Sequence, residues 1–516
     1  MADPHPPVVL AVDGASRGDV LAVARAGARV EVSDEARAAM AASRDVVAGY
    51  AASGTPVYGV STGFGGLAST YIPADRREEL QESIVRSHAA GMGDPVEVEV
   101  ARAMVFLRAR SLAMGRSGIR PEVVDAMLAL LNAGYTPLVP EHGSLGASGD
   151  LAPLAHGALV LLGEGAVRGP DGVVVPAGEA LAAVGLAPLH LEAKEGLALV
   201  NGTDGILGQL VMALDDLDVL LRTADVVAGM TVEGLLGTDR AFAADLLAMR
   251  PQVGQAVSAA NLRQVLADSA IVASHRGEDD PRVQDAYSLR CTPQVHGAAR
   301  DTLAFAGDIA DRELRAAIDN PVVLPDGRVE SCGNFHGAPL GFAADFLAIA
   351  AAEVGAIAER RVDRMLDRTR SAGLPPFLAV DAGVRSGFMI AHYTAVAMCT
   401  ENRRLAAPAS VDSLPTSAMQ EDHVSMAWSA ARKLRTVVTN LGRILAVELL
   451  AATQAIELRA PLTPAPVTAA VVARVRREVP PYDTDRHLAP ELATAAAMVT
   501  DGAVLAAAEE VCGRLP

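Results

Sequence analysis

Apolar positions in the C-terminal half recur at helical spacing over long stretches. Residues 341–367 keep apolar side chains on one helical face for several turns. The segment 386–406 repeats this pattern and ends before Pro408, and 422–460 is longer still and contains no proline. Residues 203–226 also place their leucines on one face. Successive long helices of this kind predict an elongated helical bundle.

The N-terminal half has a mixed pattern of shorter elements. Helical periodicity is found at 19–26, 33–49, 75–88, 95–114 and 121–134. Two short β-branched runs flank Pro-Asp-Gly turns, at 167–178 and at 322–330, and each predicts a β-hairpin. We therefore expect a mainly α fold: an elongated central bundle of long helices, a mixed N-terminal region and small β-hairpins.

The order of these patterns suggests three regions. Residues 1–200 form a mostly helical N-terminal region that carries a glycine-rich loop, 201–460 form the central long-helix bundle, and 461–516 form a C-terminal helical tail. Sequence repeats of 20–50 residues and low-complexity linkers are not evident, so we expect one continuous helical body.

Composition supports this interpretation and excludes several classes of function. Alanine is abundant and aromatic residues make up only 3% of the chain, which suits closely packed helices better than stacked sheets. The formal net charge of −18 over 516 residues argues against a nucleic acid or an anionic membrane as a partner, because both require a basic surface.

The cysteines, the N-terminus and the uncharged stretch of the first 100 residues indicate the cellular location. Cys291, Cys332, Cys399 and Cys512 show no CxxC spacing, so the sequence predicts neither a disulfide framework nor a metal site. The N-terminus lacks the basic and apolar segments of a signal peptide, and the uncharged stretch 46–74 is interrupted by Gly, Ser, Thr and Pro. These features lead us to expect a soluble cytoplasmic protein.

The candidate chemistry lies in the loop 143–154, GSLGASGDLAPL. It lacks the lysine of a phosphate-binding loop, and Asp150 stands where a Gly-x-Ser-x-Gly nucleophile elbow needs its second glycine. The Ala147-Ser148-Gly149 triplet can instead form an electrophile from its own backbone. The unhindered Gly149 nitrogen can attack the carbonyl of Ala147. Loss of one water from the resulting ring and of a second with the Ser148 hydroxyl then leaves an electrophilic methylidene-imidazolone. The alternative is that the triplet is only a turn.

Here the sequence resembles the aromatic amino acid ammonia-lyases, which build that prosthetic group from Ala-Ser-Gly. The similarity begins with Gly146–Leu154 and extends over nearly the whole chain. It recurs in the family's order at Tyr58–Gly65 (YGVSTGFG), Ser87–Gly91 (SHAAG), Asn201–Thr203 (NGT), Gln284–Arg290 (QDAYSLR), Gly333–His336 (GNFH) and Gln420–His423 (QEDH).

Two positions resemble the members of this family that act on histidine. Ser87-His88 matches their pair, where phenylalanine and tyrosine lyases tend to carry Phe-Leu or His-Leu, and Glu421 stands where the phenylalanine lyases have Gln. An imidazole ring needs hydrogen-bond partners that a phenyl ring would leave unsatisfied. The resemblance thus implies elimination of ammonia from L-histidine to give trans-urocanate, the first step of histidine degradation.

The resemblance also implies a role for each motif. Ala147, Ser148 and Gly149 form the 4-methylidene-imidazole-5-one, without a dissociable cofactor, and this electrophile bonds the substrate and makes its amine a leaving group. Tyr287 removes the β-proton. Arg290 binds the substrate carboxylate, and His88 and Glu421 hold the imidazole. Tyr58, Asn201 and Gln284 make catalytic or polar contacts. Phe335 packs beside the substrate ring or the prosthetic group.

In this family such residues converge across the subunits of a homotetramer, so the resemblance implies shared active sites. One departure is Met419, where many relatives carry Asn; we interpret it as neutral for specificity. The main alternative is a tyrosine or phenylalanine ammonia-lyase or an aminomutase of the same family. A non-catalytic helical scaffold and a fumarase-type lyase are the alternatives from other classes.

Overall fold

The computed structural model describes residues 6–53, 56–277 and 283–516. Residues 1–5 of the N-terminal segment considered for a targeting signal lie outside them. Within the described residues the chain forms helices α1 to α20 and a few two- or three-stranded sheets. The predicted mainly α fold class is confirmed.

The chain divides into two compact units, each assembled from separate stretches. The first unit comprises Met1–Met212, Ala306–Asp345 and Pro408–Arg432, and the second comprises Ala213–Phe305, Phe346–Ala407 and Lys433–Pro516. The boundaries at residues 212, 305, 345 and 432 fall within long helices, so each unit draws on several parts of the sequence. The division into three sequence regions stays a prediction.

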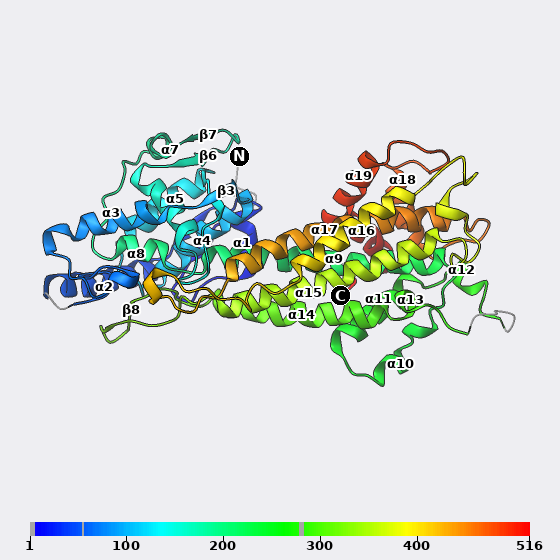
Figure 1. Cartoon of the computed structure of the whole chain (residues 1–516), viewed down its shortest axis with the longest axis horizontal. Helices are drawn as coiled ribbons and strands as arrows, with labels where there is room; N and C mark the ends of the chain where they lie inside the picture. The colour runs from blue at the N-terminus through cyan, green and yellow to red at the C-terminus, as the bar shows by residue number, and fades with distance from the viewer. Residues whose placement is uncertain (1–5, 54–55, 278–282) are drawn as a thin grey trace. The chain divides into compact units, whose positions relative to one another are not determined.

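Long helices dominate the second unit, and their positions agree with the apolar patterns. They are α9 (Asp204–Gly234), α15 (Ala338–Leu366), α16 (Met389–Leu405) and α17 (Ala427–Glu457). The long helix α14 (Thr292–Glu313), which the sequence analysis did not predict, runs beside α9 and α15 (Figure 1). The predicted start of α17 at residue 422 is five residues early, because 422–426 form a loop.

A buried ion pair and a hydrogen bond to its carboxylate join three of these helices. Arg361 of α15 donates from Nη2 to Oε2 of Glu448 of α17 at 2.9 Å, and both side chains are fully buried. Thr231 of α9 donates to the same carboxylate at 2.7 Å. Because a buried charge is tolerated only when it is paired, these contacts fix the helices relative to one another.

Two of the helices, α15 and α17, are long and apolar enough to cross a membrane by length and composition alone. However, 61% and 83% of the apolar windows of these helices are buried inside the structure. Their apolar side chains therefore pack largely against other helices of the chain.

Short helices complete the second unit. Before α14 lie α10 (Ala244–Ala248), α11 (Val253–Val265), α12 (Ala270–Ala273) and α13 (Tyr287–Arg290). The C-terminal segment folds into α18 (Pro466–Arg476), α19 (Ala489–Thr500) and α20 (Ala503–Cys512).

The first unit is built around α4 (Val98–Ala113), which is buried almost throughout its last three turns. Its other helices are α1 (Arg17–Ala24), α2 (Asp34–Ser53), α3 (Arg77–His88), α5 (Pro121–Asn132), α6 (Leu151–Leu159), α7 (Ala177–Ala183) and α8 (Glu195–Val200). Local signals set several ends. Ser16 forms a capping box with Asp19, and Pro121 occupies the first turn of α5.

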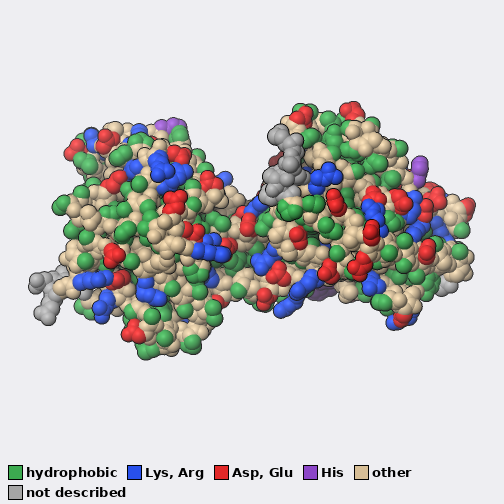
Figure 2. All heavy atoms as spheres, turned by 180° about the vertical axis from the view of Figure 1, so that it is seen from behind, with side chains coloured by type: hydrophobic (Ala, Val, Ile, Leu, Met, Phe, Trp, Pro, Cys, Tyr) green, Lys and Arg blue, Asp and Glu red, His purple; other side chains and the backbone are tan. Residues whose placement is uncertain are grey.

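Both predicted hairpins are present in the first unit: β6 (Ala166–Arg168) pairs with β7 (Val174–Pro176), and β8 (Val322–Val323) pairs with β9 (Val329–Glu330). The remaining strands were not predicted. They are β1 (Val8–Leu10), parallel to β2 (Val30–Val32), β3 (Met92–Pro95), antiparallel to β5 (Pro140–His142), and β4 (Thr136–Pro137), antiparallel to β6. Acidic and basic side chains are interspersed on the face seen in Figure 2.

Candidate active site

The Ala147-Ser148-Gly149 turn lies between β5 and α6 and tolerates no larger residue at its glycines. Gly149 has φ +72°, and a Cβ there would lie 2.0 Å from the carbonyl oxygen of Gly202. Gly146 has φ +64°, and a Cβ there would lie 2.2 Å from Oγ of Ser425. Backbone geometry and packing together therefore require glycine at both positions.

Asp150 ties this turn to the start of α9. Its buried Oδ2 accepts hydrogen bonds from the backbone nitrogens of Gly205 and Ile206, each at 2.8 Å. Its own backbone nitrogen donates to the carbonyl of Gly202 at 2.7 Å. Burial raises the pKa of Asp150 to about 8, although the two backbone donors act in the opposite direction. The side chain anchors the turn rather than facing solvent.

A second anchor comes from the start of α17, a region in which the sequence analysis found no motif. Ser425 donates from Oγ to the carbonyl of Gly146 at 2.8 Å, and the backbone nitrogen of Met426 donates to the carbonyl of Leu145 at 2.8 Å. Trp428 donates from Nε1 to the carbonyl of Glu141 at 2.7 Å. These contacts hold the loop that carries Ser148 from its other side.

Ser148 lines two cavities of the first unit. One has a volume of about 330 Å³ and is also lined by Tyr58, His88, Asn201 and Glu421. The other has a volume of about 620 Å³ and shares Tyr58, Ser148 and Glu421 with the first. Ala147 and Phe335 line the second cavity. The structure thus gathers most of the sequence-predicted site residues around one serine.

Tyr58 is held in place through its own loop. Its hydroxyl oxygen accepts a hydrogen bond from the backbone nitrogen of Gly65 at 3.0 Å, and its ring makes an edge contact with Phe64. The flanking Val57 and Val60 are buried in a cluster with Val47 of α2. Burial raises the pKa of Tyr58, and the negative charge of Glu421 adds to that rise.

His88 ends α3 at the wall of the smaller cavity, where it shares the lining with Glu421. Its Nδ1 lies 3.1 Å from Oγ of Ser87. Burial lowers the pKa of His88, and the charge of Glu421 offsets this in part. Near neutral pH, burial thus favours the uncharged imidazole, which offers one donor and one acceptor nitrogen.

Asn201 is buried and only partly satisfied. Its Nδ2 donates to the carbonyl of Asn320 at 2.9 Å and to Oδ1 of Asp319 at 3.2 Å. Its Oδ1 is buried and has no hydrogen-bond partner among the described residues. An unpaired buried acceptor costs free energy, so this oxygen is a strong candidate for contact with a bound molecule.

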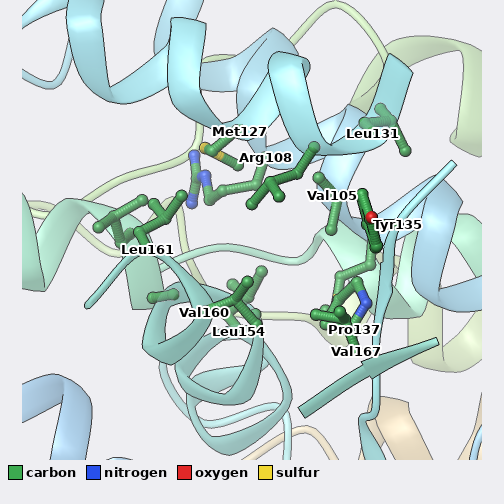
Figure 3. A pocket seen from close by; sticks show the side chains of 15 residues that line it. Val105, Arg108, Met127, Leu131, Tyr135, Pro137, Leu154, Val160, Leu161 and Val167 are labelled. Carbon is green, nitrogen blue, oxygen red and sulfur yellow. The ribbon is translucent and has the colours of Figure 1, made fainter. Parts of the chain in front are cut away.

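Arg108 supports Asn201 from the interior. Figure 3 shows its side chain along the wall of an apolar cavity that Leu154, Leu161 and Met127 also line. Its guanidinium donates a hydrogen bond from Nη1 to the carbonyl of Asn201 at 2.7 Å. The cavity in Figure 3 is a tightly packed apolar space of about 30 Å³, which we interpret as core rather than a binding site.

Phe335 and two histidines complete the larger cavity. His336 and His423 stack with ring centroids 5.6 Å apart, and both line the cavity together with Asp422. Asp422 and His423 belong to the loop before α17 and not to the helix itself.

Gln284, Tyr287 and Arg290 lie in the second unit, and none of them lines either cavity. Tyr287 is 72% exposed, and the guanidinium of Arg290 lies 4.6 Å from the centre of its ring. Arg290 donates from Nε to the carbonyl of Asp285 at 2.9 Å, and the carboxylate of Asp285 accepts from the backbone nitrogen of Thr238. Tyr287 and Arg290 thus contact each other within one segment of the second unit.

The lowered pKa of His88 predicts how pH affects stability. The ordinary pKa of histidine is about 6.5. At pH values between the lowered pKa of His88 and this ordinary value, the folded chain binds fewer protons at His88 than the unfolded chain. The free energy of unfolding therefore falls as pH decreases through that window. We expect His88→Gln to lose less stability than the unmodified chain between pH 7 and pH 5, measured by thermal unfolding. An equal loss in both proteins would contradict this expectation.

Residues 16–477 match the family model described as aromatic amino acid lyase. The chain is 63% identical to a histidine ammonia-lyase of Streptomyces coelicolor over 509 residues, which is 98% of this chain and 99% of that protein.

Solved structures give the same picture. A histidine ammonia-lyase from Trypanosoma cruzi is 40% identical with a TM-score of 0.89, and the match covers 98% of this chain and 95% of that one. A tyrosine aminomutase from Streptomyces globisporus is 38% identical with a TM-score of 0.93, over 99% and 100% of the two chains.

Proposed function

The chain belongs to the aromatic amino acid lyase family, and from that premise we infer that it is an ammonia-lyase that converts L-histidine to trans-urocanate. The observation that carries the choice of substrate is the pairing of His88 and Glu421 on the wall of the cavity that Ser148 also lines. A carboxylate and a neutral imidazole satisfy the two nitrogens of a substrate imidazole. A phenyl ring would leave both unpaired, which disfavours phenylalanine.

The Ala147-Ser148-Gly149 turn fits the methylidene-imidazolone of this family. Gly149 has no Cβ to obstruct ring closure, Ala147 is buried, and Ser148 faces both cavities. The unpaired Oδ1 of Asn201 provides a polar contact beside it. When formed, the group supplies an electrophile that makes the substrate amine a leaving group. Asp150 and Ser425 would hold its backbone in place.

The remaining roles belong to side chains that this chain itself supplies. We propose that Tyr287 removes the β-proton while the bond between the α-carbon and the amine breaks, and that Arg290 binds the substrate carboxylate. Tyr58, Gln284 and Phe335 complete the site, Tyr58 and Gln284 through polar contacts and Phe335 by packing beside the ring.

Such a site requires residues of the second unit beside residues of the first. We propose that they come from different subunits of a homotetramer. The second unit exposes apolar side chains on α14 and α15, among them Phe305, Phe346 and Ile349, which line a groove and would be covered by neighbouring subunits. We further propose that the enzyme acts in histidine degradation in the cytoplasm.

The function is tested by following product formation in the ultraviolet with L-histidine, L-tyrosine and L-phenylalanine in parallel. Urocanate from L-histidine alone is the expected result. Cinnamate or coumarate would overturn the substrate assignment. Formation of a β-amino acid would instead identify the chain as an aminomutase. This is the alternative function suggested by its similarity to a tyrosine aminomutase.

Glu421→Gln tests the origin of the selectivity. A hydrogen bond to a charged group is worth about 1.5–3 kcal/mol, so we expect kcat/KM for L-histidine to fall by roughly 10- to 100-fold. Glu330→Gln, at an exposed position of β9, is the matched control and is expected to retain activity. Equal kinetics of the two variants would show that the carboxylate of Glu421 does not contact the substrate.

A further inference from the structure

Glu421 stands at the end of a closed six-residue loop, Thr416–Glu421. The backbone nitrogen of Thr416 donates to the carbonyl of Glu421 at 2.9 Å, and the reverse bond measures 3.3 Å. The hydroxyl of Thr416 also donates to Oε2 of the Glu421 carboxylate at 3.0 Å. One residue therefore holds both the backbone and the side chain of Glu421.

The turn inside this loop is strained. Ser417, Ala418 and Met419 have φ values of +52°, +52° and +71°, a left-handed run without any glycine. Residues with a Cβ rarely adopt this conformation, and strained residues of this kind cluster at functional sites.

The turn presents Ser417 to the loop of Tyr58. The backbone nitrogen of Gly66 donates to Oγ of Ser417 at 3.0 Å. A Cβ on Gly65 would lie 2.3 Å from the same Oγ and 3.8 Å from Oε1 of Glu421, and a Cβ on Gly66 would lie 2.9 Å from the Ser417 carbonyl. Gly65 in turn donates to the Tyr58 hydroxyl. The two loops thus meet in a contact that only glycines allow.

We propose that Thr416 and Ser417 are positioning residues that act together as a clasp, Thr416 orienting the Glu421 carboxylate and Ser417 fixing the Tyr58 loop against it. The hydroxyl of Thr416 occupies Oε2, which leaves Oε1 for the substrate imidazole. The bond from Gly66 to Ser417 holds the loop in which Gly65 binds the Tyr58 hydroxyl. Substrate selectivity and the placement of Tyr58 are thereby set by one short turn. This inference rests on the proposed action on L-histidine.

Thr416→Val keeps the β-branched shape and removes the hydroxyl. We expect KM for L-histidine to rise about tenfold, with kcat changed less than threefold, because binding of the imidazole depends on the orientation of Glu421. Thr416→Ser restores the hydroxyl and is expected to return KM to the original value. Thr494→Val removes an exposed helical hydroxyl that binds the Pro490 carbonyl, and serves as the matched control without effect.

Ser417→Ala tests the second half of the clasp without an activity assay. The amide of Gly66 loses its acceptor, so its hydrogen exchange in the full-length protein should become about tenfold faster, and exchange outside the loop from Tyr58 to Gly66 should not change. Met419→Asn changes the strained turn while leaving both hydroxyls in place, since Asn tolerates a left-handed conformation. We expect it to leave the exchange of Gly66 unchanged.

An unchanged KM in Thr416→Val, or no rescue by Thr416→Ser, would overturn the role of Thr416. Unchanged exchange at Gly66 in Ser417→Ala would overturn that of Ser417. If the unmodified protein forms no urocanate, the proposed function fails and the KM expectation fails with it, whereas the exchange experiment still decides whether the clasp exists.

Discussion

Ser148→Ala is expected to lower the rate of urocanate formation from L-histidine by at least about 10³-fold, equivalent to roughly 4 kcal/mol of transition-state stabilisation. An α-amine is a poor leaving group, and the β-proton of histidine is weakly acidic. Without the Ser148 hydroxyl, the Ala147–Gly149 turn cannot become a methylidene electrophile, and the substrate amine loses the group that is proposed to activate it.

The measurement compares kcat of purified Ser148→Ala with that of the unmodified enzyme. Because Ser148 is only partly buried and loses one oxygen, thermal unfolding should change little. Ser274→Ala, which removes a hydroxyl bonded to the Ile271 carbonyl in the second unit, is the matched control and should retain full activity. A Ser148→Ala enzyme with more than a tenth of the original kcat would exclude the electrophile from the mechanism.

Tyr287→Phe is expected to lower kcat by about 10²- to 10⁴-fold, the usual contribution of a positioned general base. The ring is 72% exposed in the single chain and retains its contact with Arg290 in the variant, so the fold should be unaffected. KM should change less than kcat, because the phenol acts mainly in the transition state. Tyr393→Phe, at another exposed tyrosine, is the control.

The same pair of variants tests whether active sites are shared. If Ser148 and Tyr287 of one site come from different subunits, unfolding and refolding a mixture of Ser148→Ala and Tyr287→Phe chains should recover part of the lost activity. Some sites in the mixed oligomers then contain neither substitution. Activity no higher than that of the separate variants would mean that each chain builds its site alone.

The long helices were predictable because their apolar spacing persists over many turns. The bounds of α9 and α15 differ from the prediction by few residues at their N-termini. Helix α14 was missed because its buried alanines alternate with charged residues and several of its apolar side chains are exposed, which weakens the pattern. The strand pair β1–β2 was missed because each strand has only three residues, too few for a period to be recognised.

The family and the type of reaction were predicted from the motifs and are confirmed. The residues that hold the loops of the site in place were not predictable from the sequence. Thr416 and Ser417 carry ordinary side chains whose importance depends on a left-handed turn and on the distant Gly66, neither of which has a local signature. Ser425 was likewise hidden, since its bond to the Gly146 carbonyl joins residues 279 positions apart. The roles assigned to all the site residues, those of Gln284, Tyr287 and Arg290 included, stay predictions.

The mass of the folded chain tests the central claim most directly. If Ala147-Ser148-Gly149 forms the methylidene-imidazolone, the peptide containing residues 143–154 from the active enzyme must be lighter than its sequence by two water molecules. The same peptide from Ser148→Ala has no serine hydroxyl to lose, so it can be lighter than its own sequence by one water molecule at most. A full sequence mass for this peptide in an enzyme that forms urocanate would contradict the account, because ammonia would then leave without the proposed electrophile.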